Sequence, residues 1–226
     1  MVRGRGSGIS KNKKLKTGKI DFRLYLITDR KLIADNRSLI MAVRQALKGG
    51  VKAIQIREKD LNTRELLKLA HKMREITDKY DARLFINDRF DVALAAGADG
   101  VHLTQNSIPV DAVRKTVKEK LLIGVSTHLL KEARAAEKGG ADFITFGHVY
   151  RTHSKLKYGP PQGLDNLEEV CGKVGIPVYA IGGIKSHRID KVKKAGAYGV
   201  AMISEIFGAE DIKCKAKELV QILEYS

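Results

Sequence analysis

The regular alternation of two patterns constrains the fold of this chain more than any other feature. From residue 23 onward, short runs of β-branched and aliphatic residues alternate with segments of helical periodicity. This pattern is typical of repeated βα units that build a parallel sheet. Seven helical segments separate eight expected strands. The expected strands are residues 23–27, 52–56, 83–86, 99–103, 121–125, 142–146, 177–181 and 198–202.

The length of the repeat favours a closed barrel. About 204 residues from position 23 to the end give roughly 25 per unit, the size of a compact (β/α)8 barrel, with no room for a second domain. We therefore predict a single (β/α)8 TIM barrel over residues 21–226, with an open doubly wound sheet as the alternative. A weak internal repeat supports the units, because GGVKAIQIRE, AGADGVHLTQ, GGADFITFGH and AGAYGVAMIS each run from a glycine-ended helix into a strand.

The first twenty residues differ from the rest in composition. They carry seven lysines and arginines, four glycines and no acidic residue, within a chain whose formal net charge is +16. We expect residues 1–20 to form a disordered basic extension. Such an arm can neutralise phosphates, but no aromatic residue interrupts it and no known nucleic-acid module follows it, so we do not expect nucleic-acid binding.

Composition also excludes several classes of protein. The hydrophobic fraction of 43% is enough for a full core, and no apolar run is long enough for a membrane span or a secretion signal. Cys171 and Cys214 form no CxxC pattern, which argues against a disulfide framework or a zinc site. We expect a cytoplasmic enzyme with no membrane partner, and a homo-oligomer is compatible with the sequence.

In a barrel of this kind the reacting groups follow the strand ends. After the second strand, Gln55 and Arg57 point to one face and Lys59 lies just beyond, so two cations are available for a phosphorylated ligand. Alternatively, these cations pair with the neighbouring acidic residues Glu58 and Asp60. After the third strand, Asn87 and Asp88 offer oxygens that either hold Mg²⁺ or cap the next helix.

The later strand ends add further candidates. Ser126 supplies a hydroxyl, and His128 supplies an imidazole suited to proton transfer near neutrality, although a lone histidine is also often structural. The loop over 147–163 is long for this fold and suggests a lid or a substrate clamp over residues 148–163. The loops after strands seven and eight offer backbone N–H groups to a phosphate, at Gly182, Gly183, Ile203 and Ser204. Two adjacent glycines also serve any tight turn.

Seven motifs stand in order at the expected strand ends: QIREKD, LFIND, GVHLTQ, GVSTH, TxSK, AIGGI and MIS. In order and spacing they resemble the thiamin phosphate synthase superfamily over residues 22–220. The resemblance implies one of two enzymes on one barrel. One is the synthase, which joins an aminopyrimidine diphosphate to a thiazole phosphate and releases pyrophosphate. The other is a thiazole tautomerase, which aromatises the thiazole phosphate carboxylate.

Two departures from the synthase pattern favour the tautomerase. The synthase resemblance places Mg²⁺ between Asp88 and a second aspartate, and the aligned position here is Ser107. The segment from Phe146 to Val149 reads FGHV where the synthase typically has Gly-Pro, and VHLTQNSIP also looks closer to the tautomerase. Under this first hypothesis His128 is the catalytic acid and base, His148 supports it, and no cofactor is needed.

The synthase is the second hypothesis, with Mg²⁺ as cofactor and Asp88 as its ligand. The resemblance then implies one group of residues at the pyrimidine diphosphate and a second group that receives the thiazole phosphate. The first group is Gln55, Arg57, Lys59, Asn87, Ser126 and Lys155, and the second is Thr152, Ser154, Gly183, Ile203 and Ser204. A third hypothesis is a non-catalytic barrel that binds a phosphate ligand. All three expect a small phosphorylated thiazole or a related phosphate compound as the partner.

Overall fold

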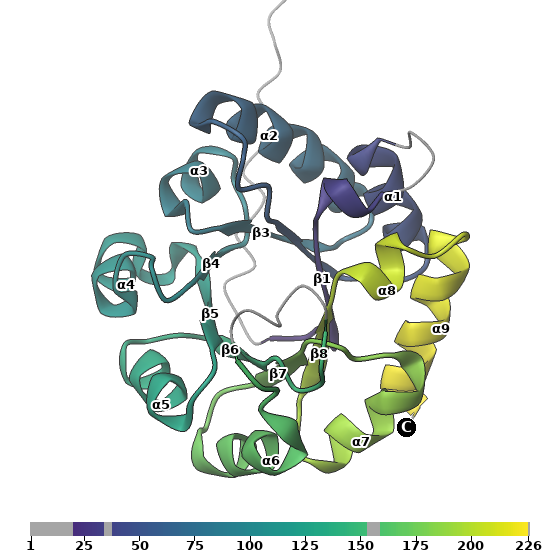
Figure 1. Ribbon diagram of the computed structural model, residues 1–226. Helices are drawn as coiled ribbons and strands as arrows, with labels where there is room; N and C mark the ends of the chain where they lie inside the picture. The colour runs from purple at the N-terminus through teal and green to yellow at the C-terminus, as the bar shows by residue number, and fades with distance from the viewer. Residues whose placement is uncertain (1–19, 34–37, 153–158, 226) are drawn as a thin grey trace, which may run out of the picture.

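The computed structural model describes residues 20–33, 38–152 and 159–225. Eight parallel strands close into a barrel in chain order, and β1 pairs with both β2 and β8. A ring of helices surrounds the barrel (Figure 1). The strands are β1 (Leu24–Ile27), β2 (Ala53–Ile56), β3 (Arg83–Asn87), β4 (Gly100–Leu103), β5 (Leu122–Thr127), β6 (Phe143–Gly147), β7 (Val178–Ile181) and β8 (Gly199–Met202).

The helices follow the strands as expected. They are α1 (Leu39–Lys48), α2 (Thr63–Lys79), α3 (Phe90–Ala95), α4 (Val110–Val117), α5 (Leu130–Lys138), α6 (Gly163–Lys173), α7 (Ile189–Lys194), α8 (Ser204–Phe207) and α9 (Ile212–Tyr225). Short 3₁₀ turns lie at Arg30–Leu32, Lys118–Lys120 and Ser186–Arg188. A capping box of Asn62 and Glu65 begins α2. The yellow α9 closes the ring beside α1 (Figure 1). No helix within the described part of the chain meets the length and hydropathy needed to cross a membrane.

The closed barrel confirms the fold prediction and excludes the open sheet. Each predicted strand overlaps an observed one, with bounds that differ by at most two residues. Residues 1–19 lie outside the described residues, so the expected disordered extension stays a prediction. Ile20, which the prediction placed in that extension, is buried, and its carbonyl accepts a hydrogen bond of 2.7 Å from Tyr198. The packed barrel therefore includes Ile20.

Aromatic rings fill the lower half of the barrel interior, which is the half toward the amino-terminal ends of the strands. Phe22, Tyr25, Phe85, Phe143 and Tyr179 are buried, and the ring of Phe22 lies 5.3–5.8 Å from the other four rings, between centroids. The strand positions facing these rings are small. Phe85 pairs with Gly100, Phe143 with Gly124, and Tyr179 with Gly199, while Tyr25 stands between Ala53 and Ala201. Large and small residues thus alternate in register, which is how a narrow barrel is filled without overlap.

The internal repeat has a physical basis in two equivalent clusters at the amino-terminal ends of β4 and β6. Asp99 precedes β4, accepts a hydrogen bond from the Leu84 N–H and pairs with Arg74 of α2 at 2.5 Å. Asp142 precedes β6, accepts one from the Ile123 N–H and pairs with Arg114 of α4 at 2.5 Å. Each arginine also donates to backbone carbonyls of the loops around it. The alanine–aspartate pairs in AGADG and GGADF therefore join helix, loop and strand in the same way.

The alternation of large and small residues gives a stability prediction. A methyl group on Gly124 would overlap the Phe143 ring and lie 2.7 Å from Nδ1 of His102. Because overpacking of a full core typically costs about 1–3 kcal/mol, Gly124→Ala should lower the free energy of unfolding by that amount in urea denaturation. Gly172→Ala is the control, since this helical glycine has nothing within 4 Å of its added methyl group. Equal stability of Gly124→Ala and the unmodified chain would contradict the packing argument.

The buried His102 gives a second prediction. Burial lowers the pKa of His102 to about 3, whereas an unfolded histidine titrates near 6.5. Between these values the unfolded chain binds one more proton than the folded chain. The free energy of unfolding should therefore fall as the pH falls below 6.5, by about 1.4 kcal/mol per pH unit from this group.

Chemical denaturation between pH 7 and pH 5 measures this slope. His102→Gln should reduce the slope by the contribution of one proton, whereas His71→Gln, at an exposed position of α2, serves as the matched control. If the two variants show the same pH dependence, His102 does not stay neutral in the folded chain.

Candidate active site

A polar layer lies directly above the aromatic layer, toward the carboxyl ends of the strands. On β2 to β6 the residue two positions after each filling residue is polar, and side chains two apart on a strand share a face. These residues are Gln55, Asn87, His102, Ser126 and Thr145. On β7, β8 and β1 the same positions hold Ile181, Ala201 and Ile27. The mouth of the barrel therefore has one polar half and one apolar half.

A chain of hydrogen bonds connects the polar layer. The amide Nε2 of Gln55 donates to the Tyr25 hydroxyl at 2.9 Å, which lies 3.4 Å from Nδ1 of His102. Nε2 of His102 lies 3.0 Å from Oγ of Ser126, and the Thr145 hydroxyl donates to the same oxygen at 3.5 Å. Side chains from five strands thereby hold Ser126 and His102 in fixed positions.

The protonation states of Tyr25 and His102 decide which group donates and which accepts in each hydrogen bond of this network. Burial raises the pKa of Tyr25, so its hydroxyl keeps its proton, and the low pKa of His102 keeps the imidazole neutral. Since Tyr25 accepts from Gln55, its own hydrogen is available to Nδ1, and Nε2 then carries the imidazole hydrogen toward Ser126. The hydroxyl hydrogen of Ser126 remains available to an acceptor outside the chain of hydrogen bonds. The network thus prepares Ser126 as a donor at the mouth.

Asp88 stands at the end of β3 with a left-handed φ of 60°, a conformation that aspartate adopts more readily than most residues. Its carboxylate accepts hydrogen bonds from Asn87 at 2.6 Å and from Thr104 at 3.1 Å, and also from the hydroxyl of Ser107. Oδ1 of Asn87 is buried and has no hydrogen-bond partner among the described residues. Two neighbouring oxygens, one of them unpaired, therefore lie at the polar half of the mouth.

Arg57 and Lys59 provide the positive charge at the mouth. Arg57 lies close enough to His102 to help lower its pKa, and Asp88 acts in the opposite direction. The neighbouring acidic residues do not neutralise these cations, because Glu58 and Asp60 pair with Arg30 and Asp60 also with Lys31. Within the described part of the chain neither Arg57 nor Lys59 forms an ion pair. The alternative reading of these cations as partners of Glu58 and Asp60 is therefore wrong.

The remaining predicted residues surround the apolar half. The backbone after β6 runs beside the end of β7, because the N–H groups of Val149 and Tyr150 donate to Ile181 and Gly182 at 2.9 and 3.0 Å. Gly182 and Gly183 both have positive φ, and added methyl groups would overlap His148 and Tyr150. The glycine pair thus permits this close approach, whether or not it also binds phosphate.

Other predicted residues lie farther out or beyond the described residues. Ile203 is half-buried and Ser204 is exposed at the start of α8, while Thr152 is half-buried in the loop after β6. Ser154 and Lys155 lie outside the described residues. Closure of the loop over 148–163 therefore stays a prediction.

His128, the predicted catalytic residue, does not join the polar network. Its side chain is 42% exposed, and Nδ1 lies 3.5 Å from Oε2 of Glu132 on α5. Its backbone N–H donates to the same carboxylate at 2.7 Å. These contacts fix the start of α5 and leave the imidazole at the outer rim, away from the hydrogen-bonded chain around His102.

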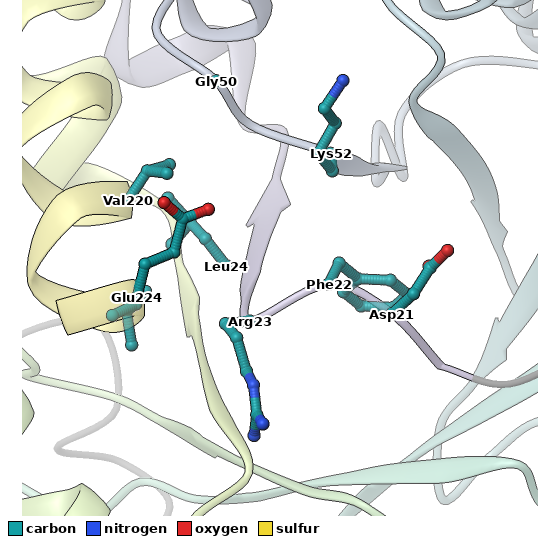
Figure 2. A pocket seen from close by; sticks show the side chains of 9 residues that line it. Asp21, Phe22, Arg23, Leu24, Gly50, Lys52, Val220 and Glu224 are labelled. Carbon is teal, nitrogen blue, oxygen red and sulfur yellow. The ribbon is translucent and has the colours of Figure 1, made fainter. Parts of the chain in front are cut away.

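A small cavity of about 80 Å³ lies at the opposite, amino-terminal end of the strands, near Phe22 and Leu24. Figure 2 shows the charged ends of Arg23 and Lys52 pointing away from each other at its edge. Both donate to backbone carbonyls, at 2.6 and 2.8 Å. Drug-sized ligands occupy cavities of roughly 300–1,000 Å³, so this hollow is too small for such a compound, and its cations already have structural roles. We place the active site at the other end.

Sequence reasoning missed two residues of the polar network, Tyr25 and His102. His102 could have been found from the strand pattern, because it alternates with the outward-facing Val101 and Leu103. Tyr25 alternates with Leu24 and Leu26 in the same way, but a tyrosine in that place also fits an ordinary core. Its hydrogen bond to Gln55 depends on strand register, which the local sequence does not reveal.

Comparison with known proteins identifies the family of this chain. Residues 24–206 match the family model described as thiamine monophosphate synthase. A thiamine-phosphate synthase of Halalkalibacterium halodurans is 45% identical over 90% of this chain and 96% of its own length, and one of Clostridium novyi is 42% identical over 90% and 99%. The solved structure of thiamine phosphate pyrophosphorylase from Pyrococcus furiosus is 41% identical with a TM-score of 0.82, covering 90% of this chain and 96% of that one. The chain therefore belongs to the thiamine monophosphate synthase family.

Proposed function

We propose that this protein is a thiamine-phosphate synthase, which joins an aminopyrimidine diphosphate to a thiazole phosphate and releases pyrophosphate. The relatives at 42–45% identity carry this name. The single observation that carries the proposal is the division of charge at the polar half of the mouth. Arg57 and Lys59 have no ion pair among the described residues there, and the oxygens of Asn87 and Asp88 stand on the next strand. Such a division suits a diphosphate bound together with a divalent cation.

Mg²⁺ fits the residues present. Magnesium is commonly bound by one or two carboxylates together with substrate phosphates and water, so Asp88 alone meets the minimum. The unpaired, buried oxygen of Asn87 beside it is a second hard donor. Ser107 occupies the place of the missing aspartate and donates to Asp88, which keeps that carboxylate oriented. When bound, Mg²⁺ would supply positive charge to the departing pyrophosphate.

The residues of the chain itself have distinct parts in this reaction. Arg57 and Lys59 bind the diphosphate and stabilise the negative charge that grows on it as it leaves. Ser126, oriented by the neutral His102, donates its remaining hydrogen to an acceptor on the substrate. The apolar half formed by Ile27, Ile181 and Ala201 gives a heteroaromatic ring a surface from which water is excluded.

The thiazole tautomerase has weaker support. Its catalytic residue would be His128, which is paired with Glu132 at the outer rim. His148 is buried against Gly182 on the apolar half. The polar network instead centres on His102, whose lowered pKa makes it a poor proton acceptor near neutrality. The geometry therefore favours pyrophosphate release over a histidine-mediated proton shift.

Pyrophosphate release tests the proposal directly. With both substrates and Mg²⁺ the purified protein should release pyrophosphate, and Asp88→Asn should reduce kcat/KM on the order of a hundredfold, because it removes the charged ligand of the cation. Asp111→Asn is the control, since this exposed aspartate pairs with Lys115 on α4. Absence of release from the unmodified protein would reject the synthase, and the tautomerase reaction would then be assayed with His128→Asn.

Ser107 provides a second prediction. A carboxylate at this position would add a charged oxygen beside Asp88, so Ser107→Asp should lower the Mg²⁺ concentration for half-maximal activity by roughly tenfold. Ser107→Asn has nearly the same shape without the charge and should not produce this decrease. Titration of activity with Mg²⁺ compares the two variants. Identical titration curves would show that Ser107 does not face the cation.

A further inference from the structure

The segment from Arg57 to Asp60 alternates basic and acidic residues at the mouth of the barrel. Neighbouring opposite charges on an exposed loop normally neutralise one another. Here the acids turn to the loop after β1, where Arg30 binds Asp60 at 2.8 Å and lies 3.5 Å from Glu58. This arrangement removes the acids from the two cations that the proposed function requires.

Glu58 is the more constrained of the two acids, with only 6% of its surface exposed. Its Oε1 accepts a hydrogen bond of 2.7 Å from the Thr28 hydroxyl, and its Oε2 accepts one of 3.4 Å from the Arg30 N–H. Burial raises the pKa of Glu58, and the contacts with Thr28 and Arg30 act against that rise. Burying a carboxylate costs free energy unless the carboxylate is paired and hydrogen-bonded, so these contacts hold Glu58 in its buried position.

Thr28 connects this carboxylate to Arg57. Thr28 is fully buried, and its N–H donates to the Gln55 carbonyl at 2.9 Å. Its hydroxyl oxygen accepts the Arg57 N–H at 3.0 Å while its hydrogen goes to Glu58. A continuous path therefore runs from the carboxylate through Thr28 to the backbone of Arg57, and the backbone fixes where the guanidinium starts.

We propose that Glu58 is a positioning residue for diphosphate binding. Its carboxylate binds Thr28 and Arg30, which fixes the backbone of Arg57 and leaves the charges of Arg57 and Lys59 for the phosphates. The inference deepens the proposed synthase function and rests on it for the identity of the substrate. Neither Thr28 nor Glu58 touches the substrate in this scheme, because both act through the backbone of Arg57.

The test separates positioning from simple stability. Thr28→Val keeps the shape but removes the hydroxyl, so the KM for the aminopyrimidine diphosphate should rise roughly tenfold, as expected for a lost hydrogen bond of about 1.4 kcal/mol. The KM for the thiazole phosphate should stay unchanged and kcat should stay within about twofold. Thr28→Ser should restore the first KM. Glu58→Gln should raise it in the same direction.

Two controls complete the design. Thr77→Val removes another fully buried threonine hydroxyl, which donates within α2 to the Arg74 carbonyl, and should lower Tm without changing either KM. The double variant Thr28→Val with Glu58→Gln should raise KM less than the product of the single effects, because both act on one hydrogen bond. Equal increases in both KM values, or no restoration by Thr28→Ser, would overturn the proposal.

Calorimetric measurement of inorganic pyrophosphate binding with Mg²⁺ separates the test of the synthase function from the test of the positioning role of Glu58. If the unmodified protein binds pyrophosphate without catalysing the coupling, the synthase function fails, and weaker binding by Thr28→Val still supports the role of Glu58. If both proteins bind pyrophosphate with the same affinity, the positioning role is rejected whether or not the protein is a synthase.

Discussion

The structure depends on how five aromatic rings fill the lower half of a narrow barrel. Phe22 enters from below and contacts rings from four strands, and the cross-strand neighbours of three of those rings are glycines. Neither set of residues is sufficient alone, because rings without the glycines would overlap and glycines without the rings would leave voids. This aromatic layer separates the polar layer from the amino-terminal end of the barrel. It also buries His102, which contacts Tyr25 and Phe143, and burial keeps the imidazole neutral.

The burial of His102 also determines which residues can supply charge at the site. A neutral imidazole between Tyr25 and Ser126 supplies no positive charge. Among the described residues that follow β2, Arg57 and Lys59 carry positive charge and form no ion pair. The carboxylates of Glu58 and Asp88 also occupy different parts of the rim. Glu58 is held in the β1–β2 contact, whereas Asp88 remains over the mouth with the unpaired oxygen of Asn87. In the proposed scheme Glu58 therefore positions the backbone of Arg57 through Thr28, whereas Asp88 faces the mouth.

Sequence periodicity predicted the barrel, its strands and most of the rim, because alternation and glycine-ended helices are local signals. It placed Gln55, Asn87, Asp88 and Ser126 at one mouth correctly, since the carboxyl ends of parallel strands meet there. It missed the network through Tyr25 and His102, since a polar residue inside a strand has no local mark of which partner register brings to it. His128 is the opposite case: its motif stands at a strand end, but its Nδ1 lies 3.5 Å from Glu132 and outside this network, so its catalytic role stays a prediction.

Ser107 shows how the two kinds of information combine. From sequence alone, the loss of an aspartate at this position counted against a metal-dependent synthase. In the structure the Ser107 hydroxyl donates to Asp88 and accepts from the Thr104 N–H at 2.6 Å, so Ser107 links this turn to the carboxylate of Asp88. A serine holds Asp88 by a hydrogen bond and, unlike an aspartate, carries no negative charge. Under the proposed function, the substitution therefore bears on how strongly a cation would bind at Asp88, and that is why it does not outweigh the charge division at the mouth.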